Sequence, residues 1–472
     1  MRSPIHPTLW RTTARLTVTT LLLAVAASCA SEARTPTEPR ARPASAKDQQ
    51  TVAAGAPIVV ASSAELVAAL ASDAAGRRIL IRAGSYEIDQ ALVVPDGVTL
   101  EGEGVMQLDE SRLPVGFEAG TRTTLVMAAD VPGAVLTLGD GVVLRRLAIE
   151  DLTGRPGVAV GVVSRGSGDR VAATIEDVEI VNPNPTGVAP QGPTGCGIAV
   201  LTLNPNMGNA PAPHEGAVVG ARISRSIIRS PAAGPGCGLF AFNFAPRAEV
   251  SVTVSDAVVG GGIIASGGVS RPDAVHDSRT VISSRRTLYR DDTPDACASS
   301  RVGWLLQGGT GVPVPLPVAA TERNSLRLHS EDDRVEGFAN AVVAVGGRRF
   351  FAKPLAGVSA HNSVDLQLLR TRIVTPACEG TDVADFQLAG GFSADASVAP
   401  GDGNTLRALL RGVTGSGARA NVYADLLGPG GPLPAGTSGN RLEIVGNPRE
   451  FTRTNYGIDP SPDVQFFSAA SR

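Results

Sequence analysis

The sequence predicts an all-β protein, a parallel β-helix in which short strands wind in one direction and stack as successive coils. The 472 residues include 54 Gly and 34 Pro, and 43% are hydrophobic, which is typical of many short strands joined by turns. Helical periodicity is rare after Gly76. Strand-like pieces instead follow one another at 135–138, 142–149, 173–181, 223–228, 250–259 and 281–288.

Besides the composition and the strand-like pieces, a weak internal repeat, N-x-[LV]-x-[LIA], predicts the β-helix. It begins at Asn324, Asn362, Asn404 and Asn440, at intervals of 38, 42 and 36 residues, and such repetition is typical of stacked units. Propeller blades have a similar period but carry repeated aromatic signatures, and Trp304 is the only Trp after the N-terminal segment. We therefore expect coils, with the four Asn amides stacked in a hydrogen-bonded structural ladder. A ligand-binding role for these Asn residues is the alternative.

The first predicted element is a short helix that begins at a capping-box pattern, Ser62 to Glu65. Apolar residues follow it at helical spacing, and Gly76 ends the pattern. Ile79 to Ile81 is then a candidate for a buried strand, and Gly84 to Tyr86 for a turn.

The stretch from Ala91 to Gly104, ALVVPDGVTLEGEG, decides the direction of winding. Read locally, Asp96-Gly97 between two alternating runs is a hairpin signal. The longer series over residues 58–104, ending in P-D-G-V-x-L-x-G-x-G, resembles the start of right-handed parallel β-helix proteins of the pectin-lyase-like superfamily. The resemblance implies a right-handed β-helix whose N-terminal helix caps the first coil. It also implies that the chain bends here into the next face.

The N-terminus predicts export. Arginines precede an apolar run at 16–27 that is too short to span a membrane. Ala26-Ala27-Ser28-Cys29 resembles the lipobox of bacterial lipoproteins, which implies lipidation of Cys29, and cleavage after Ala30 is the alternative. The expected division is a signal peptide at 1–28, a flexible tether at 29–56 and a β-helix domain at 57–472.

The charge balance argues against nucleic acid as a partner. Removing residues 1–28 takes away three arginines and no acid, so the formal net charge moves from −3 to −6. A mildly acidic chain without basic clusters is a poor candidate for binding phosphate backbones.

Four cysteines lie beyond Cys29, an even number that is consistent with two disulfides in an exported chain. Four cysteines allow three connectivities. Cys196 and Cys237 share similar Gly-flanked settings, so we favour that pair, with Cys297 and Cys378 as the second. No pair is C-x-x-C, which argues against a zinc site.

Several polysaccharide-processing families have this fold, and resemblance to pectate lyases implies calcium bound by clustered carboxylates beside a basic residue. Two acidic patches qualify: Arg290, Asp291 and Asp292 with Asp295, and Glu331, Asp332, Asp333 and Arg334. The favoured interpretation of both is a solvated turn between coils. Of the polygalacturonase motifs only Asp-Asp is present, which argues against that family.

Two further features bear on ligand binding. Three alternating aromatic residues share one face of a strand, and such a row is more typical of core than of a sugar platform: Phe240, Phe242 and Phe244. Long loops on a rigid scaffold often carry function, and three would wall a groove if they left one side: 182–216, 308–317 and 428–439.

Together these features predict an exported, lipid-anchored protein of the cell envelope with a binding or structural role. The expected partners are the membrane, through the anchor, and a polysaccharide. The polysaccharide rests on the fold resemblance alone. The alternative is a calcium-dependent polysaccharide lyase using one of the acidic patches, and calcium is a cofactor only in that case.

The anchor can be tested with Cys29→Ala. We expect this variant to lose incorporation of labelled fatty acid and to move from the membrane to the soluble fraction, because stable anchoring depends on several acyl chains. A wild-type protein that is already soluble and begins at Ser31 would contradict the anchor.

Overall fold

The computed structural model describes most of the chain from residue 56 onward. The described ranges are 56–72, 74–128, 134–152, 158–182, 196–202, 213–230, 237–270, 273–293, 295, 297, 301–311, 320–349, 359–378, 384–393, 401–415, 419–427, 431–432, 439–446, 456–458 and 464–467. The signal peptide, Cys29, the tether up to residue 55 and most of the three long loops lie outside them. No helix within these ranges has the length and apolar character needed to cross a membrane.

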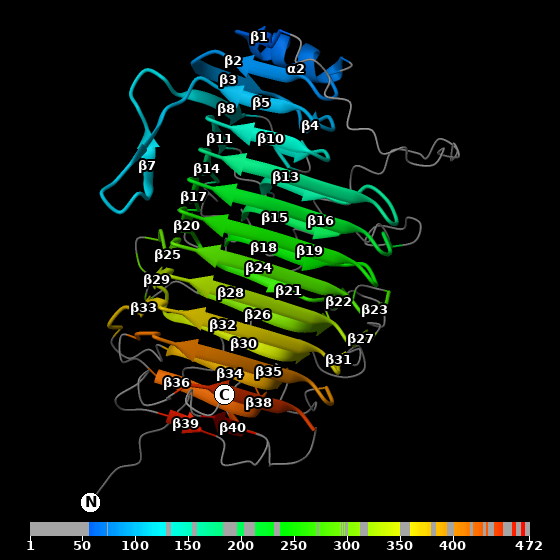
Figure 1. Cartoon of the computed structure of the whole chain (residues 1–472), viewed down its shortest axis with the longest axis vertical. Helices are drawn as coiled ribbons and strands as arrows, with labels where there is room; N and C mark the ends of the chain where they lie inside the picture. Colours follow the sequence, from blue (N-terminus) through cyan, green and yellow to red (C-terminus); the bar gives the residue numbers. More distant parts are fainter. Residues whose placement is uncertain are drawn as a thin grey trace, which may run out of the picture.

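The chain is a right-handed parallel β-helix. Three sheets, here called A, B and C, run the length of the molecule, and successive coils contribute one strand to each in turn. Neighbouring strands of these sheets are parallel, except for β36 and β37 at the end of sheet C. The strands that follow Asn324 and Asn362 pair in register over seven residues, from Ser325 with Ser363 to Glu331 with Leu369. Sheet A faces the viewer in Figure 1, with sheet C behind it.

The strands of sheet A are β1 Ile58–Val60, β2 Arg78–Ile81, β5 Thr99–Gly102, β10 Val142–Arg145, β13 Arg170–Glu176, β16 Val218–Ser224, β19 Glu249–Ser255, β24 Arg279–Arg285, β28 Ser325–Glu331, β32 Ser363–Leu369, β35 Thr405–Arg411, β38 Arg441–Val445 and β40 Val464–Phe467. Those of sheet B are β3 Gly84–Ile88, β8 Thr123–Met127, β11 Ala148–Asp151, β14 Glu179–Val181, β17 Ile227–Arg229, β20 Val258–Gly260, β25 Leu288–Arg290, β29 Arg334–Glu336 and β33 Arg372–Val374.

The strands of sheet C are β4 Leu92–Val94, β9 Leu136–Leu138, β12 Val158–Val163, β15 Cys196–Thr202, β18 Cys237–Asn243, β21 Ile263–Ser266, β22 Val269–Ser270, β26 Val302–Gly311, β30 Asn340–Arg349, β34 Ala384–Ser393, β36 Arg419–Leu427, β37 Gly431–Pro432 and β39 Tyr456–Ile458. Two small sheets complete the fold: β23 Val275–His276, β27 Thr321–Glu322 and β31 Ser359–Ala360, and the pair β6 Met106–Leu108 and β7 Pro114–Phe117.

The stretch from Ala91 to Gly104 does not fold back on itself. β4 pairs with β9 in sheet C, whereas β5 pairs with β2 and β10 in sheet A. Gly97 has φ of 72° at the bend, a left-handed conformation that glycine adopts without a steric penalty. The bend therefore passes the chain from one face to the next, as the resemblance implied.

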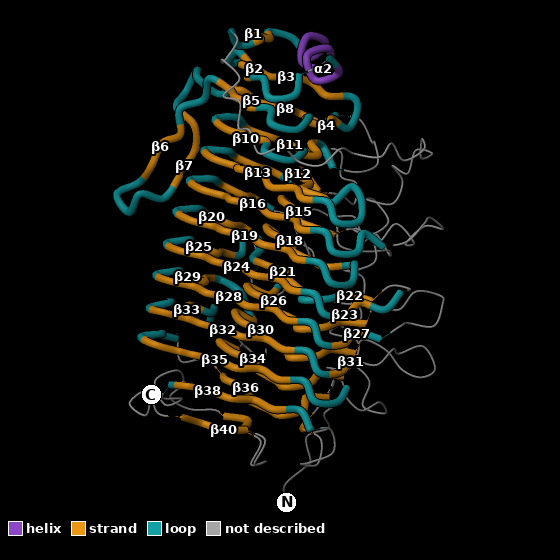
Figure 2. The backbone as a smooth tube through the Cα atoms, turned by 45° about the vertical axis from the view of Figure 1, so that its right-hand side comes forward, coloured by secondary structure: helices purple, strands orange, loops and turns teal. Residues whose placement is uncertain are grey.

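Helix α2 (Ser63–Ala71) covers the N-terminal end of the coils (Figure 2). The Ser62 hydroxyl accepts from the backbone N–H of Glu65 at 3.2 Å, and the Glu65 carboxylate accepts from the N–H of Ala61 at 2.7 Å. The Ser62 bond is the N-cap half of the predicted capping box, and Glu65 reaches back to the residue before the N-cap rather than to Ser62 itself. Leu66 and Leu70 are buried against the first coil, so the helix closes the core at this end.

Apolar side chains fill the inside of the β-helix, and a second apolar cluster lies on the outer side of sheet C. Along β18, Leu239 and Ala241 belong to the inner core, whereas Phe240 and Phe242 belong to the outer cluster. The Phe240 and Phe242 rings stack at 3.9 Å, and both residues are buried. The aromatic row is core, as predicted, and offers no exposed platform.

The four repeat asparagines lie at the corner between sheets C and A, and all are buried. The Asn362 amide oxygen accepts from the N–H and the side-chain amide of Asn324, at 3.0 and 3.1 Å. Its own amide donates to the carbonyl of Thr321 at 2.9 Å and to the amide oxygen of Asn404 at 3.2 Å. The same pattern continues from Asn404 to Asn440.

The left-handed backbone conformation at this corner falls on the residue before each Asn. Arg323 and His361 both have φ of 54°, and Gly403 and Gly439 both have φ of 63°. The reason is that the turn needs one left-handed residue to change direction, after which the Asn points inward. The Asn residues themselves do not adopt the left-handed conformation.

Replacing Asn362 with Leu is expected to leave hydrogen-bonding groups above and below it unsatisfied. Each such group costs about 1–3 kcal/mol, and the damage should begin locally because coils contact only their neighbours. Hydrogen exchange should therefore quicken first between about Asn324 and Asn404. Asn362→Ser is the milder variant, because a serine already occupies the ladder position one coil before Asn324: Ser278 accepts there from the N–H of Ala248. Gln367→Leu, on the outer surface, is the control, and equal exchange in all three would exclude the ladder.

Candidate functional site

The carboxylates of the first acidic patch are divided among different partners. The Asp291 side chain is buried, 3.8 Å from the guanidinium of Arg301. Asp292 accepts from Arg290 at 2.7 Å and lies over Gly260. A Cβ at Gly260 would come within 1.9 Å of an Asp292 carboxylate oxygen, so only glycine fits there. Asp295 accepts from the N–H of Cys297 at 3.0 Å.

The second acidic patch is also divided. Glu331 ends β28 on the outer side of sheet A, and Asp332 has φ of 57° in the exposed turn, where it pairs with Arg370. Asp333 points inward and is buried. Arg334 pairs with Glu336 on sheet B.

In the second patch, the carboxylates do not converge on one point. Successive side chains of a strand point to opposite faces, and the left-handed turn separates Asp332 from both of its neighbours. Within the described ranges, no group of three or more His, Cys, Asp or Glu side chains is arranged to bind a metal ion. A catalytic or calcium-binding role for either patch stays a prediction.

Asp333 forms a buried polar group with the residues around it. Its carboxylate accepts from the N–H of Thr287 at 2.8 Å and from the hydroxyl of Ser330 at 2.7 Å. Burial raises the pKa of Asp333 to about 6, and the two hydrogen bonds only partly oppose that rise. The position of this carboxyl inside the coil gives it a structural role, equivalent to that of the Asn residues at the other corner.

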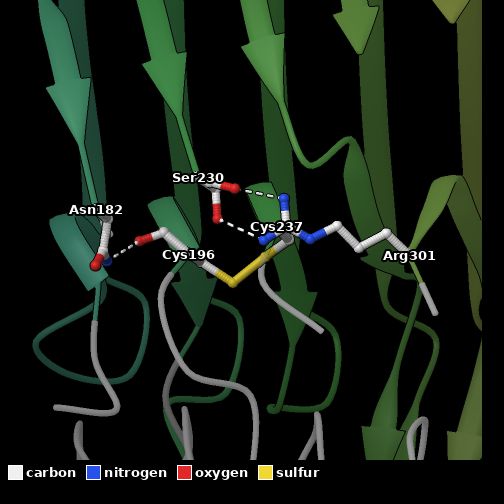
Figure 3. The surroundings of a disulfide bond; sticks show 5 residues. All are labelled: Asn182, Cys196, Ser230, Cys237 and Arg301. Atoms are coloured by element: carbon white, nitrogen blue, oxygen red, sulfur yellow. Dashed lines mark hydrogen bonds between the residues drawn. A yellow bond between two sulfur atoms is a disulfide. The ribbon is translucent and has the colours of Figure 1, made fainter. Parts of the chain in front are cut away.

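Both disulfides join the cysteines paired above. Cys196 and Cys237 face each other on adjacent strands β15 and β18, with their Cα atoms 4.5 Å apart. Beside them, Arg301 donates to the carbonyl of Ser230, as Figure 3 shows. Cys297 and Cys378 are joined with their Cα atoms 5.6 Å apart. Two disulfides are typical of proteins that work outside the cytoplasm.

Charges alternate along the turn between sheets A and B. One left-handed residue of each coil occupies this turn: Arg146, Asp177, Arg225, Asp256, Arg286, Asp332 and Arg370. Arg225 donates twice to Asp177, at 2.8 and 2.9 Å, and Arg286 and Arg370 bind Asp256 and Asp332 in the same way. These hydrogen bonds lower the pKa of Asp332 and raise that of Arg370. The turn is therefore a row of internally paired charges.

The outer side of sheet A carries a different set of charges. Between β24 and β38, six arginines point outward, and we call them the arginine face: Arg279, Arg285, Arg327, Arg407, Arg411 and Arg441. Three carboxylates share this side: Glu331, Asp365 and Glu443. Arg327 pairs with Asp365 at 3.0 Å, and Arg285 lies 3.6 Å from Glu331.

The other four arginines of the face are unpaired as far as the chain is described: Arg279, Arg407, Arg411 and Arg441 have no carboxylate within 4.0 Å among the described residues, and all four are exposed. Arg407 and Arg411 both belong to β35, and Arg441 begins the next strand. Since the strands are held in register, these guanidinium groups occupy regular positions on one face, where Arg407 lies between Asp365 and Glu443 of the neighbouring strands without an ion pair to either.

Sequence reasoning missed the arginine face, although the repeat contained a signal for it. The third position after each repeat Asn is occupied by Arg327, Asp365, Arg407 and Glu443. In the structure these four lie in one outward column across β28, β32, β35 and β38. Reading the repeat for its outward as well as its inward positions would have identified this column.

The histidines of the described ranges lie at separate places in the fold. His214 lies 2.9 Å from the Ser164 hydroxyl, and burial lowers the pKa of His214. His329 lies on the outer side of sheet A, 3.4 Å from the Gln367 amide oxygen. Tyr289 and Trp304 are buried and pack edge to face at 5.3 Å, so neither is available for stacking on a sugar.

Comparisons with known proteins give little further information. No family model matches the chain, and no curated protein matches it. Among solved structures, a mutant of the PL6 family alginate lyase AlyGC matches with 10% sequence identity and a TM-score of 0.21, covering 88% of this chain and 76% of that chain. A match at this level supports no statement about substrate or activity.

Asp333→Asn is expected to change how stability depends on pH. The folded pKa, about 6, lies above the unfolded value of 3.8, so the folded state holds the proton more tightly. Wild-type stability should therefore fall as pH rises from about 4 to 6, by about 1–3 kcal/mol for a shift of this size. Asn remains neutral, so the variant should not show that fall.

Urea unfolding at pH 4 and pH 8 measures the difference. Asp332→Asn is the control, because the pKa of Asp332 is lowered by Arg370 and its loss should reduce stability at pH 8. Parallel pH profiles for Asp333→Asn and wild type would contradict the assignment.

Proposed function

We propose that this protein is an exported, membrane-anchored envelope protein that binds an acidic polysaccharide along the outer side of sheet A. One observation carries the proposal. The outward side chains from β24 to β38 include six arginines and three carboxylates, a net charge of +3, in a mature chain whose expected net charge is −6. A positive surface on an acidic protein favours an anionic partner.

The chemistry of the unpaired arginines supports a carboxylate-bearing partner. A guanidinium presents donors in a planar fork that matches a carboxylate, and such charge-assisted hydrogen bonds are stronger than neutral ones. Arg407 and Arg411 have no such acceptor within the described chain, so a bound carboxylate would displace only water. A ligand that passes from β24 to β38 would meet arginines on several coils.

An extended polymer suits this surface better than a small molecule does. Parallel strands lie about 4.8 Å apart, so five strands offer a flat, regular surface rather than an enclosed pocket. Each exposed arginine contributes a weak, salt-screened interaction. Affinity would then come from several such contacts along one chain.

The proposed location in the cell envelope rests on the N-terminal signal and the two disulfides. Cys29 as lipid anchor would tie the mature chain to a membrane through a tether of Ser, Thr, Pro and Ala. The two disulfides are consistent with a location outside the cytoplasm. The function proposed is therefore binding in the envelope rather than catalysis.

Binding to a polyuronate is the direct test. We expect the mature protein to bind polyuronate but not a neutral glucan of similar length, and expect affinity to fall with added salt. The double variant Arg407→Gln and Arg411→Gln should bind about tenfold more weakly, since each lost contact is worth about 0.7 kcal/mol or more. Arg170→Gln and Arg222→Gln, two exposed arginines of the same sheet outside the arginine face, form the matched control.

The same mixtures test the alternative of a lyase. Absorbance of unsaturated product should stay flat with calcium and with chelator. A rise that occurs only with calcium would replace the binding function with catalysis. Equal affinity of the two double variants would instead remove the arginine face as the binding surface.

A further inference from the structure

A hairpin replaces one turn of the β-helix. In later coils, the chain passes from sheet A to sheet B through one left-handed residue, such as Arg146 between β10 and β11. Between β5 and β8, residues 103–122 intervene instead and form the antiparallel pair β6 and β7. The hairpin projects from the side of the molecule near its N-terminal end (Figures 1 and 2).

The hairpin is held firmly at its base. Gly104 donates to the carbonyl of Arg146 at 3.1 Å, and Val105 donates to the Thr121 hydroxyl at 3.1 Å. A Cβ at Gly104 would come within 2.7 Å of both the Arg146 carbonyl and the Phe117 ring, so the backbone sits directly against the coil. Such a fixed arm gives a preformed surface rather than a loose loop.

A cavity of about 240 Å³ lies between the hairpin and the turns beneath it. Val105, Met106 and Leu108 form its aliphatic wall, and Arg146, Asp177 and Arg225 form its charged floor. Leu108 is 44% exposed and Val105 is 48% exposed, so both apolar side chains are accessible to a ligand in the cavity.

The floor offers donors and acceptors side by side. Arg225 uses its Nε and Nη2 atoms for Asp177 and Glu176, which leaves its Nη1 group without a hydrogen-bond partner among the described residues. These hydrogen bonds raise the pKa of Arg225, so the guanidinium stays charged. The Asp177 carboxylate beside it retains lone pairs that can accept.

We infer that this cavity binds one pyranose unit. A pyranose has an apolar face of C–H groups and neighbouring hydroxyls that both donate and accept, which matches an aliphatic wall beside an arginine–carboxylate pair. The inference rests on the proposed function in that the ligand class is the same, a saccharide. The site is separate, because the arginine face lies on β24 to β38 and the cavity lies beside β5, β10, β13 and β16.

Leu108 and Val115 provide the decisive comparison. Val115 is 52% exposed on the same hairpin but does not line the cavity. We expect Leu108→Gln to weaken binding of short oligosaccharides by about tenfold, the effect of losing roughly one buried side-chain contact, and Val115→Gln to leave it unchanged. Because both residues are exposed, neither change should disturb folding.

The probes are uronate and neutral gluco-oligosaccharides of two to six sugars, measured by calorimetry, together with the long polyuronate. Loss of affinity for short chains in Leu108→Gln, with polymer binding still dependent on Arg407 and Arg411, supports a separate site. Equal affinity of Leu108→Gln and Val115→Gln, or no binding of any short saccharide, overturns the inference. Polymer binding that persists in that case leaves the proposed function standing.

Discussion

The regular coil depends on how the buried corner between sheets C and A satisfies its backbone. Where strands end and the chain turns inside a protein, N–H and C=O groups lose their sheet partners and must find others. The repeat asparagines supply both: in Asn404, the amide oxygen accepts from the N–H of Asn362, and the amide nitrogen donates to the carbonyl of Ser359. Each coil is thereby fixed to the next at the same point of its turn.

Glycines in sheet C make room for this arrangement. A Cβ at Gly309 would lie 2.4 Å from the Asn362 side chain, and one at Gly347 would lie 2.4 Å from that of Asn404. The Gly-Gly pairs at 308–309 and 346–347 are thus the partners of the Asn residues in the following coil. The ladder and its glycines keep the register, and the register sets which side chains gather outside.

The same register explains why some features could be predicted from the sequence and others could not. The N-cap at Ser62 and the buried row at Phe240 depend on local pattern, which a sequence displays, whereas the bend at Gly97 was predicted from a longer series and against the local hairpin signal. The sequence could not place the carboxylates of the acidic patches, because residues adjacent along the chain can lie on different sides of the coil, as Asp332 and Asp333 do. Contacts between coils join residues that lie far apart in the sequence, 48 positions for Arg225 with Asp177 and 30 for Arg286 with Asp256, and a single sequence does not show which residues stack.

The arginine face can be recognised only once it is known which strands stack. Whether an arginine is available to a ligand depends on whether it already binds a carboxylate. Lys47 and Lys353 are the only lysines, so Arg supplies nearly every positive charge wherever it lies, and the presence of Arg is no evidence of a site. At the turn between sheets A and B, the arginines bind carboxylates of the neighbouring coil, and these ion pairs join one coil to the next. On the outer side of sheet A, Arg279, Arg407, Arg411 and Arg441 have no such partner among the described residues. The turn arginines use most of their donors on the neighbouring coil, as Arg225 does with its Nε and Nη2 atoms, whereas these four arginines have no described carboxylate partner.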